Sequence, residues 1–197
     1  MIPHDIPDRP FQKIAADICE YGNKNYLIVM DYFSKWLEII PIVTKRSGEL
    51  IKRFRSFFAT HGIPEELIAD NMPFSSYEFR VFANSWNFKI VTSSPRYPQS
   101  NGQAEKCVHI AKRILKKCTE DRCDYYTSLL EYRNTPIPGI NSTPAQMLMS
   151  RRCRTKLPIR DELLCPQIIE GVKEKLRCRQ IKNRKIIITN RQARKNT

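Results

Sequence analysis

Three acidic residues could do metal chemistry, and one of them, Asp17, stands where a solvated side chain would be unusual. Asp17 lies inside an extended apolar run at 14–19, and Asp70 follows a shorter one at 67–69. Glu105 stands where a turn-rich stretch passes into an amphipathic helix. Carboxylate oxygens suit hard divalent cations, and pairs of such cations promote phosphoryl transfer. Two aspartates on strands and a glutamate on a helix could therefore converge on a metal pair.

Glu105 also has a simpler interpretation. Ser100 or Asn101 can cap the helix, which places Glu105 in its first turn. A carboxylate in that turn is favoured by the helix dipole whether or not it binds a metal. Taken alone, Glu105 fits this structural role better than a catalytic one. The two strand-borne aspartates are what favour metal binding.

The elements that position these acids follow from hydrophobic periodicity. Residues 11–43 are rich in β-branched and aromatic side chains and predict three strands, with the first turn at Gly22 and Asn23. Residues 47–61 predict a helix that Ser47 caps and Gly62 ends.

Two more strands are predicted at 65–69 and 88–92, separated by a helix that Ser75 or Ser76 caps. The helix of Glu105 follows, and then helices at about 121–134 and at 144–149, the latter capped by Thr143. This order predicts an α/β fold with a central mixed sheet flanked by helices. The apolar stripe of the Glu105 helix comprises Ala104, Cys107, Val108, Ala111, Ile114, Leu115 and Cys118.

The charge is uneven along the chain. It carries 34 Lys and Arg against 20 Asp and Glu, a net charge of +14. Residues 150–197 contain 15 basic and 4 acidic residues, so the last quarter holds most of the excess. Such a tail indicates a polyanionic partner, usually nucleic acid, although a solvated helical tail would have the same composition.

Seven cysteines without a Cys-x-x-Cys pair indicate free thiols in a reducing compartment. The three histidines are isolated, which disfavours a zinc site. No apolar run approaches the ~18 residues of a membrane span, and the N-terminus lacks the apolar segment of a signal peptide. We expect an intracellular protein that is not secreted and has no membrane partner.

With Asp17 and Asp70, the stretch around Glu105 resembles the catalytic core of integrases from retroviruses and Ty3/gypsy-type retrotransposons, which carry an Asp, Asp, Glu triad. The resemblance covers roughly residues 9–158. Its motifs are Arg9-Pro10-Phe11-Gln12, Tyr26, Phe33-Ser34, Gly62-Ile63-Pro64, Asp70-Asn71, Ser94-Pro95-Arg96-Tyr97-Pro98-Gln99-Ser100-Asn101-Gly102, Glu131-Tyr132-Arg133-Asn134-Thr135-Pro136, Thr143-Pro144-Ala145 and Leu157-Pro158.

The resemblance implies a ribonuclease H-like fold with a five-stranded mixed sheet. It implies that Asp17, Asp70 and Glu105 are catalytic and hold two Mg²⁺ or Mn²⁺ ions for 3′-end processing and strand transfer of DNA. Relatives use a lysine at the position of Lys112 to contact DNA ends, and Asn101 occupies a loop position suited to DNA near the cleavage site. Further DNA contacts are expected from Lys106, His109 and Lys116.

It also implies partners and organisation. The expected partners are the DNA ends of the element, target DNA and further copies of the chain, in the nucleus after passage through the cytoplasm. We expect a linker at 1–8, the integrase catalytic core at 9–158, and a basic extension at 159–197 that is poorly structured or helical. A charged helix is predicted at 170–183.

Some features favour a catalytically inactive, retrotransposon-derived module that binds nucleic acid or protein. The family pattern Asp-Asn-Gly-x-x-Phe is one residue shorter here, where it reads Asp70-Asn71-Met72-Pro73-Phe74. Met72 resists the positive φ that glycine adopts, so this loop must follow another path. Relatives carry a zinc module before the core and a DNA-binding module after it, and we expect neither in this chain.

Two other possibilities carry less weight. A ribonuclease H-type nuclease would share the fold, but the run 98–102 ahead of Glu105 fits integrases better. Asp31 is a further acid in the second predicted strand. The family pattern places no metal ligand there, so Asp31 is left out of the predicted site.

Overall fold

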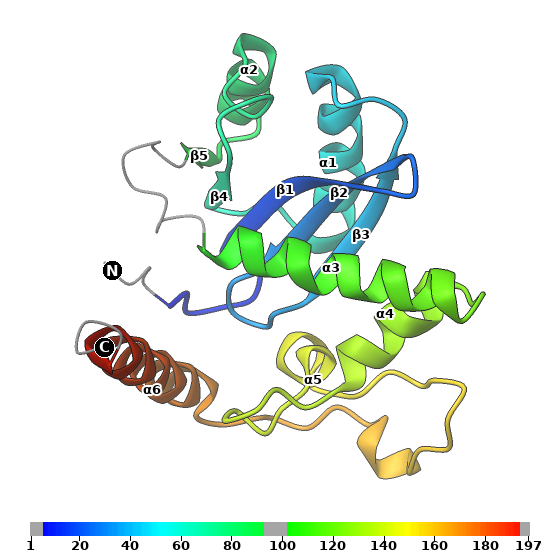
Figure 1. Cartoon of the computed structure of the whole chain (residues 1–197), viewed down its shortest axis with the longest axis vertical. Helices are drawn as coiled ribbons and strands as arrows, with labels where there is room; N and C mark the ends of the chain where they lie inside the picture. Colours follow the sequence, from blue (N-terminus) through cyan, green and yellow to red (C-terminus); the bar gives the residue numbers. More distant parts are fainter. Residues whose placement is uncertain (1–5, 93–101, 194–197) are drawn as a thin grey trace.

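The computed structural model describes residues 6–92 and 102–193. Within them, five strands form one mixed sheet in the order β3-β2-β1-β4-β5 (Figure 1). β2 pairs antiparallel with β1 and β3, whereas β4 pairs parallel with β1 and β5. The predicted five-stranded mixed sheet is confirmed. The strands are β1 Lys13–Tyr21, β2 Lys24–Asp31, β3 Leu37–Ile42, β4 Glu66–Ala69 and β5 Lys89–Thr92.

Helices cover both faces of this sheet. α1 and α2 pack on one face, and α3 crosses the other with α4 beside it (Figure 1). Among the helices of the described part of the chain, none combines the length and apolar character that crossing a membrane requires. The helices are α1 Ser47–His61, α2 Tyr77–Ser85, α3 Gly102–Glu120, α4 Tyr125–Asn134, α5 Pro144–Met149 and α6 Val172–Ala193, with a 3₁₀ turn at Asp161–Leu163.

Successive side chains of β1 alternate between two hydrophobic layers. Ile14 and Ala16 pack in the layer with α1 and α2. Ala15 and Cys19 pack in the layer with α3 and α4. Because side chains alternate along a strand, Asp17 falls on the same face as Ala15 and Cys19. The acid on β1 therefore lies on the side of the sheet that α3 covers.

Short-range signals in the sequence place most element ends correctly. Gly22 and Asn23 have φ angles of 56° and 58°, as the two-residue turn between β1 and β2 requires. Gly62 ends α1 with a φ of 88°. The Ser76 hydroxyl accepts a hydrogen bond from the backbone N–H of Phe79 at 3.3 Å, and so caps α2 as predicted.

One predicted helix cap and one predicted helix start are wrong. Ser47 is the first residue of α1 rather than its cap, and the residue before it provides no side-chain hydrogen bond. α4 begins at Tyr125 rather than near residue 121. The Asp124 carboxylate accepts a hydrogen bond from the backbone N–H of Tyr126 at 3.1 Å and caps the helix. The helix therefore begins later in the sequence than its apolar pattern suggested.

Asp31 is fully buried at the end of β2 and organises the connection to β3. Its Oδ1 accepts a hydrogen bond from the backbone N–H of Phe11 at 2.9 Å. Its Oδ2 accepts two more from Ser34, one from the backbone N–H and one from the hydroxyl, both at 2.6 Å. Burial raises the pKa of Asp31, and the hydrogen bonds from Ser34 and Phe11 oppose that rise. Asp31 therefore has a structural role.

The C-terminal residues of α4 tie this helix to the sheet. The Tyr132 hydroxyl donates a hydrogen bond to the Lys35 carbonyl at 3.0 Å. Arg133 donates to the Leu37 carbonyl at 2.9 Å and forms an ion pair with Glu38 at 2.8 Å. The motif at 131–136 thus holds α4 against the β2–β3 connection.

Part of the basic extension is packed against the core. Val172 and Leu176, in the first turns of α6, lie in a small apolar cluster with Phe33. Lys173 forms an ion pair with Asp8. The predicted charged helix is confirmed, and it continues beyond its predicted end to residue 193.

Replacing Thr143 by alanine should destabilise the fold by about 1 kcal/mol. The Thr143 hydroxyl accepts a hydrogen bond from the backbone N–H of Gln146, and the Gln146 side chain accepts one from the backbone N–H of Thr143. The alanine variant should melt about 2–4 °C lower in a thermal unfolding experiment. Thr143→Ser, which keeps the hydroxyl, should recover most of this loss. Equal melting of the alanine variant and the wild type would contradict the prediction.

Candidate active site

The pairing of β1 with β4 places two of the predicted acids next to each other. Ala16 on β1 is the register partner of Ala69, the last residue of β4. The next residues are Asp17, in the middle of β1, and Asp70, directly after the end of β4, so the two acids are adjacent across this parallel pair. This adjacency depends on the crossover through α1, since the two acids are far apart in sequence.

α3 supplies the third acid. Its Cys107, Ala111 and Leu115 are buried in the same apolar layer as Ala15 of β1, which holds the helix across that face of the sheet. Glu105 stands in the first turn of α3 and is exposed. The buried stripe predicted from periodicity is confirmed for the described side chains that it includes.

The electrostatics of Asp17 show that the three acids act on one another. Burial raises the pKa of Asp17, while a hydrogen bond from the Ile18 backbone N–H at 2.7 Å lowers it. The negative charges of Asp70 and Glu105 raise this pKa further, and the positive charge of Lys112 lowers it. A half-buried carboxyl thus faces two more acids and one cation.

These acids have the chemistry of a divalent metal site. All three offer carboxylate oxygens, and their mutual repulsion is what a bound cation would relieve. Among the residues that the structure describes, no three His, Cys, Asp or Glu side chains are gathered closely enough to form a metal-binding group. The assignment of Asp17, Asp70 and Glu105 as metal ligands stays a prediction.

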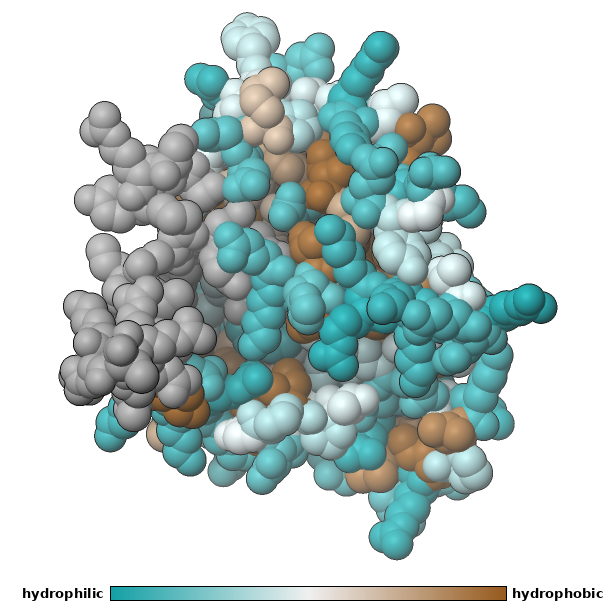
Figure 2. Space-filling model, viewed as in Figure 1, coloured by the Kyte–Doolittle hydropathy of each residue, from teal (hydrophilic) through white to brown (hydrophobic). Residues whose placement is uncertain are grey.

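The predicted DNA-binding residues divide between two sides of α3. His109 and Lys112 are exposed, one and two turns after Glu105. Lys106 and Lys116 instead line a pocket between α3 and α4, where Lys116 also lies 3.7 Å from Glu120. Hydrophilic side chains cover much of the face that α3 crosses (Figure 2). Asn101 lies outside the described residues, as do residues 93–100.

The loop after β4 carries the shortened motif. It contains a cis peptide bond between Met72 and Pro73. Met72 is exposed, and Phe74 is buried with its ring centroid 5.4 Å from that of Phe79. The loop therefore leaves Asp70 at the surface and returns to the core at Phe74.

Sequence reasoning missed the pocket between α3 and α4. Its volume is about 760 Å³, and its lining includes Lys35, from the β2–β3 connection, and Arg179, from α6. Neither residue stands out by periodicity or by spacing from the acids. The only signal was the position of Lys35 directly after the Phe33-Ser34 motif, which does not indicate a pocket by itself.

Comparison with known proteins points to mobile elements. The chain is 31% identical to an uncharacterized protein of Caenorhabditis elegans, K02A2.6, over 80% of its own length. The chain is also 29% identical to the Transposon Tf2-3 polyprotein of Schizosaccharomyces pombe, and this match covers 55% of the present chain. The chain spans only 13% and 9% of the lengths of these two relatives. No family model matches the chain.

Two solved structures with a similar fold come from retroviruses. One is a chain from a simian T-cell lymphotropic virus intasome in complex with PP2A regulatory subunit B56 gamma. It aligns with the present chain with a TM-score of 0.64 and 21% identity, over 81% of the present chain and 63% of the intasome chain. The HTLV-2 integrase catalytic core domain in complex with magnesium aligns with a TM-score of 0.57 and 22% identity, over 71% and 97%. The described architecture is that of these catalytic cores, which confirms the ribonuclease H-like fold.

Proposed function

We propose that this chain, which has the fold of retroviral integrase catalytic cores and a sequence similar to retrotransposon polyproteins, is an integrase-type polynucleotidyl transferase. Its substrate would be DNA, and its parent a Ty3/gypsy-like element. The observation that carries this proposal is the pairing of β1 with β4, which places Asp17 next to Asp70, with Glu105 and Lys112 of α3 close enough to act on the charge of Asp17. Three acids beside a cation suit metal-assisted chemistry at a phosphodiester.

Asp17, Asp70 and Glu105 would hold two Mg²⁺ or Mn²⁺ ions. The magnesium complex of the HTLV-2 core, a protein of the same fold, supports this choice of metal. When bound, such an ion pair activates the attacking oxygen and stabilises the leaving oxygen of an in-line displacement. The attacking group would be water in end processing and a DNA 3′-hydroxyl in strand transfer.

The chain's own residues would position the DNA. Lys112 lies near Asp17 and would hold a phosphate beside the acids. His109 occupies the intervening turn of α3 and would add a second contact. Asn101 would approach DNA near the cleavage site, and Lys106 and Lys116 would extend the basic surface of the same helix. None of these contacts requires a covalent intermediate on the protein.

Other regions would support the reaction. The basic extension 159–197 would add non-specific affinity for DNA through its cations. A further copy of the chain is an expected partner, in line with the trimeric and dimeric forms of the HTLV-2 core. Joining DNA to a chromosome would place the protein in the nucleus.

A second candidate function is a DNA- or protein-binding module without catalysis. The observation that favours it is the shortened loop 70–74, in which Met72 stands two residues after a predicted metal ligand, Asp70. A loop of different path would shift the approach of Asp70 to the metal ions.

An assay with a labelled duplex separates the two candidates. If the chain is a transferase, it should nick or join the duplex in Mg²⁺ or Mn²⁺, because the acids need a divalent ion to act on a phosphodiester. Chelation by EDTA should abolish the products, and Asp17→Asn should not form them. Binding of the duplex without any product in either metal would instead support the module.

A further inference from the structure

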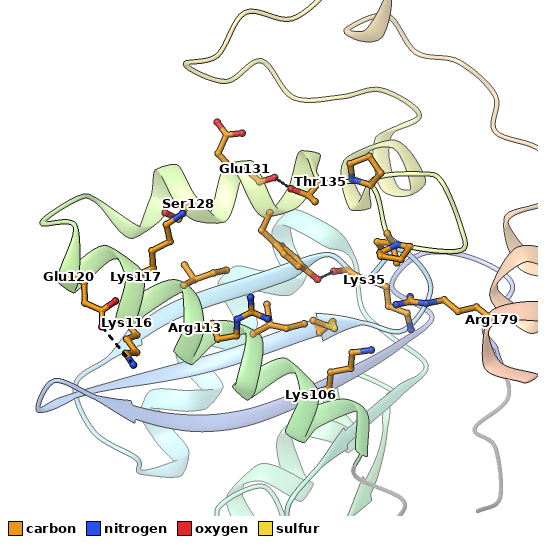
Figure 3. Close-up of a pocket in the computed structure, with 17 residues that line it drawn as sticks. Lys35, Lys106, Arg113, Lys116, Lys117, Glu120, Ser128, Glu131, Thr135 and Arg179 are labelled. Atoms are coloured by element: carbon orange, nitrogen blue, oxygen red, sulfur yellow. Dashed lines mark hydrogen bonds and ion pairs between the residues drawn. The ribbon is translucent and has the colours of Figure 1, made fainter. Parts of the chain in front are cut away.

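The pocket between α3 and α4 is separate from the acidic triad, since none of the three acids lines it. Its walls are one side of α3, the facing side of α4 and the segment 135–138. Met30 and Lys35 reach it from the sheet side, and Arg179 reaches it from α6 (Figure 3). Its volume of about 760 Å³ has room for several side chains of a ligand.

Three cations converge at one end of this pocket. Figure 3 shows the nitrogen atoms of Lys35, Lys106 and Arg179 pointing toward a common region. Burial lowers the pKa of Lys35 to about 8, and the positive charges of Lys106 and Arg179 lower it as well, against the opposing charge of Asp31. The Lys35 ammonium donates one hydrogen bond, to the Tyr32 carbonyl at 2.7 Å.

Within residues 6–92 and 102–193, this cluster of Lys35, Lys106 and Arg179 forms no ion pair with an acid, although the charge of the buried Asp31 acts on Lys35. The acids that line the pocket are Glu120, which lies beside Lys116, and Glu131. Gathering like charges in a partly buried place costs free energy, and an anionic ligand would offset that cost.

Apolar side chains form part of the remaining lining of the pocket, alongside the charged side chains of Arg113, Lys116 and Lys117. Ile110 and Ile114 line it from α3, and Ile137 lines it from the segment after α4. A nucleic-acid backbone would neutralise the cations but leave these aliphatic side chains uncovered. A peptide with an acidic residue next to an apolar one satisfies both parts of the pocket, through charge-assisted hydrogen bonds and burial of apolar area.

We propose that this pocket docks a short acidic peptide segment of a partner protein. A carboxylate of the peptide would sit among Lys35, Lys106 and Arg179, and a neighbouring aliphatic or aromatic side chain would cover Ile110 and Ile114. Docking here needs neither the acidic triad nor a metal ion. It therefore does not depend on catalysis.

Selection from a random peptide library on the whole chain tests this docking. The selected peptides should pair Asp or Glu with large apolar residues, and a fluorescein-labelled one should lose affinity when its acids become Asn or Gln. Arg179→Glu should weaken its binding by more than about tenfold, and Lys35→Gln should weaken it too. Arg177→Glu is the matched control, because Arg177 is an exposed arginine of the same helix that does not line the pocket.

The proposal would be overturned if the selection did not enrich acidic peptides, or if the Arg179→Glu and Arg177→Glu variants bound the peptide equally well. It would also be overturned if a DNA duplex displaced the peptide fully and Arg179→Glu weakened binding of the duplex and of the peptide by the same factor. This last outcome would assign the pocket to the nucleic-acid surface. Circular dichroism checks that the variants fold. If Arg179→Glu fails to fold, Lys35→Gln decides between docking and no docking.

Discussion

Glu105→Gln should abolish metal-dependent cleavage and joining of DNA while leaving DNA affinity unchanged or slightly higher. Glutamine keeps the size of the side chain but removes the charge that raises the pKa of Asp17 and would bind a metal ion. Changes to groups that only support metal ligands cost about 10- to 100-fold, so loss of a ligand should reduce the rate by more than about 100-fold. DNA affinity depends on cations such as Lys112, and removing a negative charge does not weaken them.

Glu78→Gln is a close control for this prediction. Glu78 is an exposed glutamate in the first turn of α2, as Glu105 is in α3. If Glu105 served only the helix dipole, both substitutions would have the same small effect on stability and neither would affect cleavage. Product formation by Glu105→Gln at the wild-type rate would therefore remove Glu105 from the active site. Equal losses of binding and cleavage would assign it a structural role.

Asp31→Ala should destabilise the fold by about 3–5 kcal/mol, the largest stability loss that we expect from a single substitution. The change leaves the backbone N–H groups of Phe11 and Ser34 without their acceptor in a fully buried place. Each lost hydrogen bond to a charged group costs about 1.5–3 kcal/mol, and unpaired buried donors add to this. Chemical denaturation monitored by circular dichroism measures the change in the free energy of unfolding.

Two further variants give this prediction its controls. Asp31→Asn keeps the volume and one acceptor oxygen, so its loss should be smaller than that of alanine. Asp121→Ala removes an exposed aspartate and should change stability by less than about 0.5 kcal/mol. If Asp31→Ala were no more harmful than Asp121→Ala, the three hydrogen bonds at Asp31 would not stabilise the fold.

Features that depend on neighbouring residues could be predicted from the sequence. The turn at Gly22 and Asn23, the end of α1 at Gly62 and the caps at Ser76 and Thr143 each follow from backbone conformations or hydrogen bonds within a few residues. The two wrong predictions also concerned local capping, where one residue caps a helix in place of another. Ser47 made no capping hydrogen bond, and the start of α4 was decided by Asp124.

Contacts between distant residues could not be predicted in this way. The Tyr132 hydroxyl reaches the Lys35 carbonyl across 97 positions in the sequence, and Arg133 reaches the Leu37 carbonyl across 96. The motif that contains Tyr132 and Arg133 was part of the resemblance to integrases, but its sequence did not indicate that these two residues hold α4 against the sheet by hydrogen bonds.

By itself, the sequence determined the alternation of strands and helices, the buried stripe of α3 and the three acids to consider. Hydrophobic periodicity and capping are short-range, so they can be deduced from the order of residues. Only the tertiary structure decided that Asp17 and Asp70 are neighbours, through the pairing of β1 with β4. It also decided that Lys35 and Arg179 share a pocket. Both results depend on how the helices pack against the two faces of the sheet. The free energy of that packing comes from contacts along the whole chain, and no single motif reveals it.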